Sequence, residues 1–228
     1  MTTLMIGCGG VGTVLAEQLL AAGEVLWIGS RRQPATGGHW FALDVLADSY
    51  RLPDELPERI ERLIYLPGSI NLKPLARIKA QELRDAFELN VVGAMRCVQA
   101  LLPRLQQAES ASITLVSTVA VSQGMGFHTT VAAAKGALEA LTRAWAAELA
   151  PRIRVNCVAP SLTDTPLAAS LLSSDDRRQL AAKRHPLGRV GQPADIASAI
   201  AWLSAPTASW VTGQVLHVDG GLSRLRLL

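Results

Sequence analysis

The sequence predicts an α/β fold, a doubly wound parallel sheet with helices on both faces, and three observations carry that prediction. Short apolar runs alternate with longer amphipathic segments, which is typical of consecutive βα units with right-handed crossovers. The chain has 228 residues and is 49% hydrophobic, enough for one large core. No polar or low-complexity linker divides it, so we expect a single domain over residues 1–228.

The first βα unit carries a glycine-rich turn. A short apolar strand at residues 4–6 runs into Gly7, Gly9 and Gly12, and an amphipathic helix then continues to Gly23. These glycines fit G-x-G-x-x-G between a strand and a helix, where the backbone can approach a pyrophosphate at the helix amino end. The turn predicts a Rossmann-type dinucleotide site, and an ordinary glycine-rich βα turn is the alternative.

Basic residues follow the second strand, which we expect at residues 24–29. Arg31 and Arg32 follow it closely, and no acidic residue is present there. An acid at this place would bind the ribose 2′-hydroxyl of NAD(H), whereas arginine accommodates the 2′-phosphate of NADP(H). The sequence therefore favours NADP(H), with a pair of solvated loop arginines as the alternative.

The middle of the chain supplies two more strands and a long helical pattern. A strand at residues 40–43 ends at Asp44 and Val45, and another at 63–66 runs into Gly68. Residues 53–58 hold two prolines, so any helix there is short. The pattern over 81–106 contains Asn90, a poor mid-helix residue because its side chain competes for backbone hydrogen bonds.

The central segment combines a hydroxyl with a lysine. A strand at residues 113–116 is followed by Ser117 and Thr118, then by a loop and a helix that carries Lys135. Apolar residues on that helix recur at spacings of three and four, namely Ala134, Leu138, Leu141 and Trp145. A hydroxyl at the carboxyl end of a strand and a lysine on the next helix suit a ligand site in an open α/β sheet.

The carboxyl-terminal third continues the alternation. We expect strands at residues 152–160 and 215–218, with a helix introduced by residues 192–195 between them. Residues 173–176 are a possible start for another helix.

Together these segments resemble the short-chain dehydrogenase/reductases, in which a serine precedes a tyrosine by thirteen residues and a lysine follows that tyrosine by four. On this chain the lysine is Lys135, the serine position is Thr118 and the tyrosine position is Val131. Valine has no proton to give, and the two tyrosines, Tyr50 and Tyr65, fall in other segments.

The resemblance implies hydride transfer between nicotinamide and a small carbonyl or alcohol substrate, with residues 161–190 covering that substrate. It implies catalytic roles for Lys135, Thr118 and Asn90, the last ordering a water. The implied cofactor contacts are Asp44 and Val45 at the adenine ring, Gly68 at the adenosine ribose, Lys135 at the nicotinamide ribose, and Thr165 at the nicotinamide carboxamide or adjoining phosphate. Leu66, Pro67 and Ser161 depart from the family pattern, which has Asn-Ala and glycine at these places.

Two functional interpretations follow from the missing tyrosine. The first is a working NADP(H)-dependent oxidoreductase whose proton comes from Lys135 through a water, from His128, or from no protein group at all. For His128 the alternative is a loop histidine exposed to water. The second interpretation is a cofactor-binding protein with degraded chemistry, acting as a sensor or as the non-catalytic partner of an active homologue.

Composition argues against several other classes. The net charge is only +3 and the basic residues are scattered, so we expect no nucleic-acid binding. Cys8, Cys97 and Cys157 lie far apart, so neither a disulfide framework nor a zinc site is expected. No apolar run reaches the roughly 18 residues that span a bilayer. The amino terminus enters a strand at once, so we expect a cytoplasmic protein, and by resemblance a homodimer or homotetramer.

Overall fold

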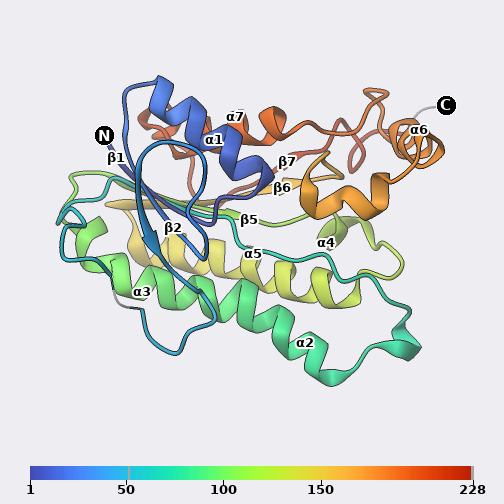
Figure 1. Cartoon of the computed structure of the whole chain (residues 1–228), viewed down its shortest axis with the longest axis horizontal. Coiled ribbons are helices and arrows are strands. Elements are labelled where there is room, and N and C mark those ends of the chain that lie inside the picture. The colour runs from blue at the N-terminus through green and yellow to red at the C-terminus, as the bar shows by residue number, and fades with distance from the viewer. Residues whose placement is uncertain (51, 227–228) are drawn as a thin grey trace.

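The computed structural model describes residues 1–50 and 52–226. Within them a seven-stranded parallel sheet has the order β3-β2-β1-β4-β5-β6-β7 (Figure 1). The strands are β1 (Thr2–Ile6), β2 (Val25–Ser30), β3 (His39–Ala42), β4 (Arg62–Tyr65), β5 (Ala111–Val116), β6 (Ile153–Pro160) and β7 (Val215–Val218). The order reverses between β1 and β4, which is the switch point where open α/β sheets bind their ligands.

Helices cover both faces of this sheet, as the sequence predicted. In Figure 1, α1 (Gly10–Ala21) and α7 (Pro193–Ser204) lie on one face, and α3 (Gly93–Gln106) and α5 (Thr129–Leu149) lie on the other. The helix α2 (Ala80–Phe87) extends the second layer, while α4 (Ala120–Gln123) and α6 (Asp175–Arg184) lie beyond the carboxyl ends of the strands. Short 3-10 turns complete the elements, at Leu75–Arg77, Pro166–Leu172 and Pro206–Ala208.

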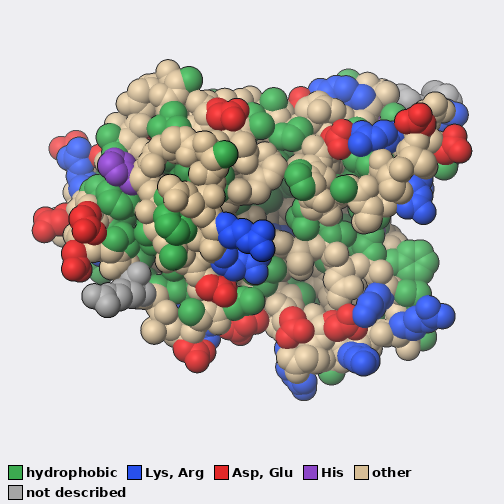
Figure 2. Space-filling view, viewed as in Figure 1, with side chains coloured by type: hydrophobic (Ala, Val, Ile, Leu, Met, Phe, Trp, Pro, Cys, Tyr) green, Lys and Arg blue, Asp and Glu red, His purple; other side chains and the backbone are tan. Residues whose placement is uncertain are grey.

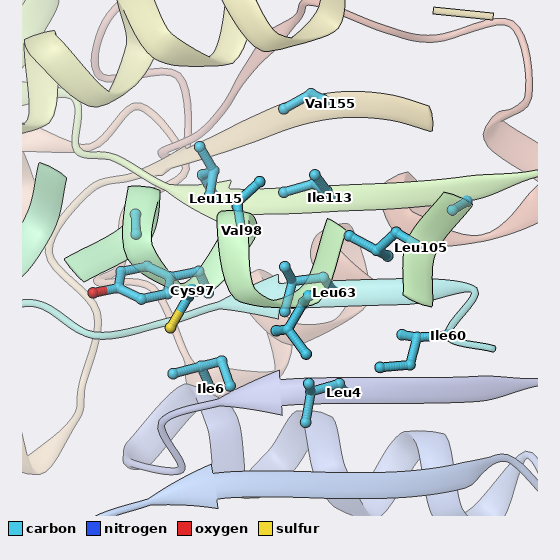
Figure 3. Packing of buried hydrophobic residues seen from close by; sticks show 14 of the residues in the cluster. Leu4, Ile6, Ile60, Leu63, Cys97, Val98, Leu105, Ile113, Leu115 and Val155 are labelled. Atoms are coloured by element: carbon cyan, nitrogen blue, oxygen red, sulfur yellow. The ribbon is translucent and has the colours of Figure 1, made fainter. Parts of the chain in front are cut away.

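The sheet separates two hydrophobic cores, because strands of a parallel sheet bury both faces. Figure 3 shows part of the core under α3 and α5, where side chains of the strands meet those of α3, among them Leu4, Leu63, Val98 and Ile113. The second core lies between the sheet and the α1–α7 pair, and its centre includes Leu15, Ile28 and Ile200. These two layers fix the carboxyl ends of the strands relative to one another.

The predicted helix over 81–106 forms, but not as one regular helix. A π-helical turn (Glu88–Val92) separates α2 from α3. Asn90 lies in that turn, and its Nδ2 donates a hydrogen bond of 2.8 Å to the Ala86 carbonyl. Turns of this kind insert an extra residue into a helix and recur at functional sites.

Other expectations need smaller corrections. Residues 53–58 form turns, in line with the two prolines there, whereas the loop expected after Thr118 contains α4. The predicted start near residue 173 is confirmed, because the Ser174 hydroxyl caps α6 by accepting from the Arg177 N–H. No helix in the part of the chain that the structure describes is long and apolar enough to cross a bilayer.

Candidate active site

Lys135 is buried at the carboxyl ends of β4 and β5. It projects from α5, and only 6% of the residue is exposed. Its Nζ donates a hydrogen bond of 2.6 Å to the Val116 carbonyl and lies 3.5 Å from the Pro67 carbonyl. Burial removes the ammonium from water and lowers the pKa of Lys135 from 10.5 to about 8. At neutral pH this lysine holds a proton that it can release readily.

Asn90 and Gly68 complete the surroundings of that ammonium. A Cβ added to Gly68 would lie 3.3 Å from the Lys135 Nζ and 3.6 Å from the Asn90 Oδ1, so both polar atoms border the same small space. Asn90 is buried, and its Oδ1 has no hydrogen-bond partner among the described residues. A buried amide oxygen normally has a partner, so this atom suits a bound water or ligand.

Two neighbouring hydroxyls follow β5, and the structure separates their roles. Ser117 is buried, and its Oγ donates a hydrogen bond of 2.6 Å to Glu139 on α5. Thr118 is half-buried, and its Oγ1 accepts from the Ala120 N–H at 3.3 Å. That bond does not use the hydroxyl proton of Thr118, which stays available to a ligand at the strand end.

The glycine-rich turn meets α1 in the geometry that its spacing predicted. Gly7 has φ +83° and lies against the Pro67 ring, a conformation that favours glycine. A Cβ on Gly12 would lie 2.9 Å from Leu66 Cδ1, whereas a Cβ on Gly9 would meet nothing within 4 Å. The first turn of α1 holds no acidic residue. This open backbone at a helix amino end suits an anion.

The sequence motif did not include Gly10, although the structure gives it a contact in the site. A Cβ there would lie 2.9 Å from the Cβ of Thr165. The loop after β6 therefore lies directly against the start of α1, and Thr165 is brought to the glycine-rich turn. The four glycines within six residues were the available signal for this close approach.

The residues expected at the adenosine end lie at the ends of β2 and β3. Arg31 and Arg32 are exposed, and neither forms an ion pair with another residue of 1–50 and 52–226. Asp44 is exposed and caps a turn, since its Oδ1 accepts from the Leu46 N–H at 3.0 Å. Val45 is buried beside it. Figure 2 shows basic and acidic side chains interleaved over the visible face, without one continuous basic surface.

Comparison with known proteins agrees with this arrangement. A family model described as enoyl-(acyl carrier protein) reductase matches residues 55–223. A tropinone reductase homolog of Arabidopsis thaliana is 31% identical over 95% of this chain and 89% of its own length. A short-chain type dehydrogenase/reductase from Mycobacterium ulcerans superposes with a TM-score of 0.88, at 26% identity, over 99% of this chain and 90% of that one. The chain belongs to the short-chain dehydrogenase/reductase family.

Other family members match shorter stretches. A second tropinone reductase homolog of Arabidopsis thaliana is 36% identical over 72% of this chain. The match spans only 63% of that relative's own length. The 3-oxoacyl-(acyl-carrier-protein) reductase FabG of Thermotoga maritima is 34% identical over 74% of this chain and 72% of its own. The aldohexose dehydrogenase of Thermoplasma acidophilum has a TM-score of 0.88, at 25% identity, and covers the whole chain.

Within this short-chain dehydrogenase/reductase, no tyrosine of the described residues is free to act as an acid. Val131 is half-buried on α5, one turn before Lys135. Tyr65 donates its hydroxyl proton to the Leu89 carbonyl at 2.6 Å, and Tyr50 donates to the Val45 carbonyl at 2.7 Å. Burial raises the pKa of both phenols well above the ordinary value.

The side chain of His128 also has a hydrogen-bond partner within the protein. It is the residue before α5, and its Nδ1 lies 2.7 Å from the Gly126 carbonyl, to which it donates. His128 therefore lies at the end of the loop, as the alternative interpretation had it, but it is half-buried rather than exposed to water.

The residues present fit the nicotinamide dinucleotides that this family binds. The space over Gly9 is open to a pyrophosphate, and the polar ends of Lys135 and Asn90 lie beside Gly68. The unpartnered Asn90 Oδ1 marks the same region as polar. Among the described residues, no group of His, Cys, Asp and Glu could hold a metal ion.

Proposed function

We propose that this protein is an NADP(H)-dependent oxidoreductase that interconverts a small carbonyl and the corresponding alcohol, with Lys135 as its source of protons. The observation that carries the proposal is the buried ammonium of Lys135, which faces the same space as the unpartnered Asn90 Oδ1 beside Gly68. The bound cofactor would supply the hydride. The protein must then hold the substrate and give one proton to its oxygen.

The preference for NADP(H) rests on the end of β2. Two exposed arginines are free of carboxylate partners there, and the Ser30 hydroxyl donates to the Arg32 carbonyl at 2.7 Å, which fixes the backbone of the turn. Guanidinium groups without other partners can bind a phosphate through bidentate hydrogen bonds. This arrangement supports recognition of the 2′-phosphate.

Proton delivery by Lys135 follows from its surroundings. Its Nζ and the Asn90 Oδ1 both lie within 4 Å of one point beside Gly68. A water bound between these two polar atoms could accept from the lysine and donate to the amide oxygen, and then pass a proton toward the substrate. The Thr118 hydroxyl could hold the substrate oxygen at the end of β5. A positioned acid of this kind contributes about 10²- to 10⁴-fold to the rate.

Substitution at Val131 tests the assignment. We expect wild-type protein to oxidise NADPH with some members of a panel of small aldehydes and ketones, and Val131→Tyr to raise kcat by at least about tenfold. Val131→Phe is the matched control, because it adds the ring without the hydroxyl. Lys135→Met should abolish turnover in the wild-type background.

A second function is favoured by Val131 itself together with Leu66, both of which depart from the family pattern. In this alternative the protein binds NADP(H) and acts as a sensor or as the non-catalytic partner of an active homologue. Binding of NADPH by calorimetry, with turnover only in Val131→Tyr, would support the alternative and reject the enzyme. Turnover by the wild type would support the enzyme and reject the alternative.

Two further assignments complete the proposal. Residues 161–190 would cover the substrate, since they lie beyond the carboxyl ends of β6 and β7 and include α6. The protein would form a homodimer or homotetramer through α2, α3 and α5, whose outer faces include the exposed Leu83 and Met95. A strict monomer by light scattering at micromolar concentration would contradict the assembly.

A further inference from the structure

A serine and a histidine form a close pair outside the space around Lys135. Ser161 follows β6 at the place where the family pattern has glycine, and His185 follows α6. The Ser161 Oγ lies 2.8 Å from the His185 Nε2. On its other side, the His185 Nδ1 lies 2.7 Å from the Ala181 carbonyl. Both residues belong to the segment 161–190 proposed to cover the substrate, but the function proposed above uses neither side chain in its chemistry.

The hydrogen bonds fix the direction of this pair. A carbonyl only accepts, so the Nδ1 of His185 carries the hydrogen that bonds to Ala181. In the neutral ring the Nε2 is then an acceptor, and the Ser161 hydroxyl donates to it. This is the relation of a nucleophile to its general base, with the base oriented by a third group.

The surroundings of His185 also hold the orientation that a general base needs. The residue is 4% exposed, so its ring is held in place by packing. The carbonyl of Ala181 belongs to the last turn of α6, where helix carbonyls carry partial negative charge. That charge would stabilise the imidazolium formed when Nε2 takes the serine proton.

A small cavity opens at this pair. Its volume is about 110 Å³. Its walls include apolar side chains, among them Leu162, Leu187, Ile196 and Val218. The charged residues Arg189, Asp195 and Asp219 also line it. One water occupies about 30 Å³ of the liquid, so the cavity has room for a group the size of acetyl or propionyl.

A donor for a developing oxyanion is also at hand. Among the hydrogen bonds of residues 1–50 and 52–226, none uses the Leu162 N–H as donor. This amide directly follows Ser161. Backbone N–H groups beside a nucleophile stabilise the oxyanion of acyl transfer.

We propose that Ser161 and His185 are a nucleophile–base pair that hydrolyses small activated esters in this cavity. The Ser161 Oγ forms a bond to the acyl carbon while its proton passes to the His185 Nε2. The carbon–oxygen bond to the alcohol then breaks, and His185 returns the proton to the leaving alkoxide. Water repeats the two steps on the acyl-serine and releases the carboxylic acid, which restores the pair.

The molecule contains its own control for this geometry. Ser122 and His217 form a second serine–histidine pair, with the Ser122 Oγ 3.3 Å from the His217 Nε2. Ser122 is exposed and His217 is half-buried, and among the described residues the other ring nitrogen of His217 has no hydrogen bond that orients it. A serine and a histidine in mere proximity would behave alike at both places, whereas the proposal gives activity only to Ser161.

The experiment is hydrolysis of p-nitrophenyl acetate by the full chain, followed by acid quenching and mass spectrometry of peptides. We expect acetylation of Ser161, and a rate above that of Ser161→Ala and His185→Gln by at least about tenfold. Ser122→Ala and His217→Gln should match the wild type in both rate and acetylation of Ser161.

The proposal would be overturned by acetyl groups only at lysines or at Ser122, or by a Ser161→Ala rate equal to that of the wild type. If His185→Gln fails to fold, the location of the label in the wild type and in Ser161→Gly still decides, because glycine is the family residue there. NADPH binding and carbonyl reduction are separate readouts, so failure of either function does not affect the other test.

Discussion

Lys135→Met gives a direct test of the buried ammonium. The lysine is almost fully buried, and the pKa lies at about 8 in the folded protein against an ordinary 10.5. A difference of two to three units, at about 1.4 kcal/mol each, corresponds to about 3 kcal/mol of cost for holding the charge in the fold. Below pH 8 the whole of this cost lowers the free energy of unfolding, because both the folded and the unfolded chain carry the proton.

Between pH 8 and 10.5 the unfolded chain binds one proton more than the folded chain at this residue. The free energy of unfolding therefore gains a contribution that rises with pH. The buried thiols of Cys97 and Cys157 act in the opposite direction, since burial raises the pKa of each to about 12. Both proteins contain these thiols, so the difference between wild type and Lys135→Met cancels the thiol contributions except for the charge interaction between Lys135 and Cys157.

We expect the wild type to gain about 2 to 3 kcal/mol over Lys135→Met between pH 7 and pH 10, measured by urea unfolding at each pH. The lost hydrogen bond to Val116 adds an offset that does not change with pH. Lys79→Met is the control: this ammonium is exposed and keeps its hydration in both states, so its difference should stay flat. A flat difference for Lys135→Met as well would refute the reasoning and remove Lys135 as the acid.

Two further substitutions test the cofactor site. Gly12→Ala places a Cβ 2.9 Å from Leu66 Cδ1, so we expect a loss of about 1 to 3 kcal/mol, seen as a lower Tm, whereas Gly9→Ala has open space and should unfold like the wild type while binding NADPH more weakly. Equal Tm values for the two variants would contradict this. The double variant Arg31→Ala/Arg32→Ala should lose about tenfold or more in affinity for NADPH and keep its affinity for NADH, and calorimetry showing equal losses would remove the arginines from 2′-phosphate recognition.

All seven strands were predictable from the sequence because each is a short apolar run that ends in a turn signal. The helix starts at Ser174 and Gln192 were also visible, since capping residues act locally. The glycine-rich turn could be recognised because its spacing, strand and helix come from one continuous stretch. These features depend on neighbours in the chain, which the sequence displays.

The remaining features depend on distant contacts. Ser117 and Thr118 are adjacent, and only the fold decides that Ser117 bonds to Glu139 while Thr118 stays at the strand end. The approach of Gly10 to Thr165 and the pairing of Ser161 with a histidine 24 residues away likewise required three-dimensional positions. Asn90 was noticed as an unfavourable helix residue, but the π-helical turn that accommodates it was not foreseen.

That turn has a consequence for how this helix can change in evolution. An α-helical residue advances about 100° around the axis, and the turn Glu88–Val92 holds one residue more than a regular helix needs. Deleting one residue there would let the helix continue without a break, with the packed face of α3 unchanged. The helices on either side would keep their orientation and only the residues of the turn would shift, so the amide of Asn90 would no longer face Gly68. A one-residue length difference at this point among homologues therefore marks the gain or loss of a polar group in the site, while the hydrophobic core stays intact.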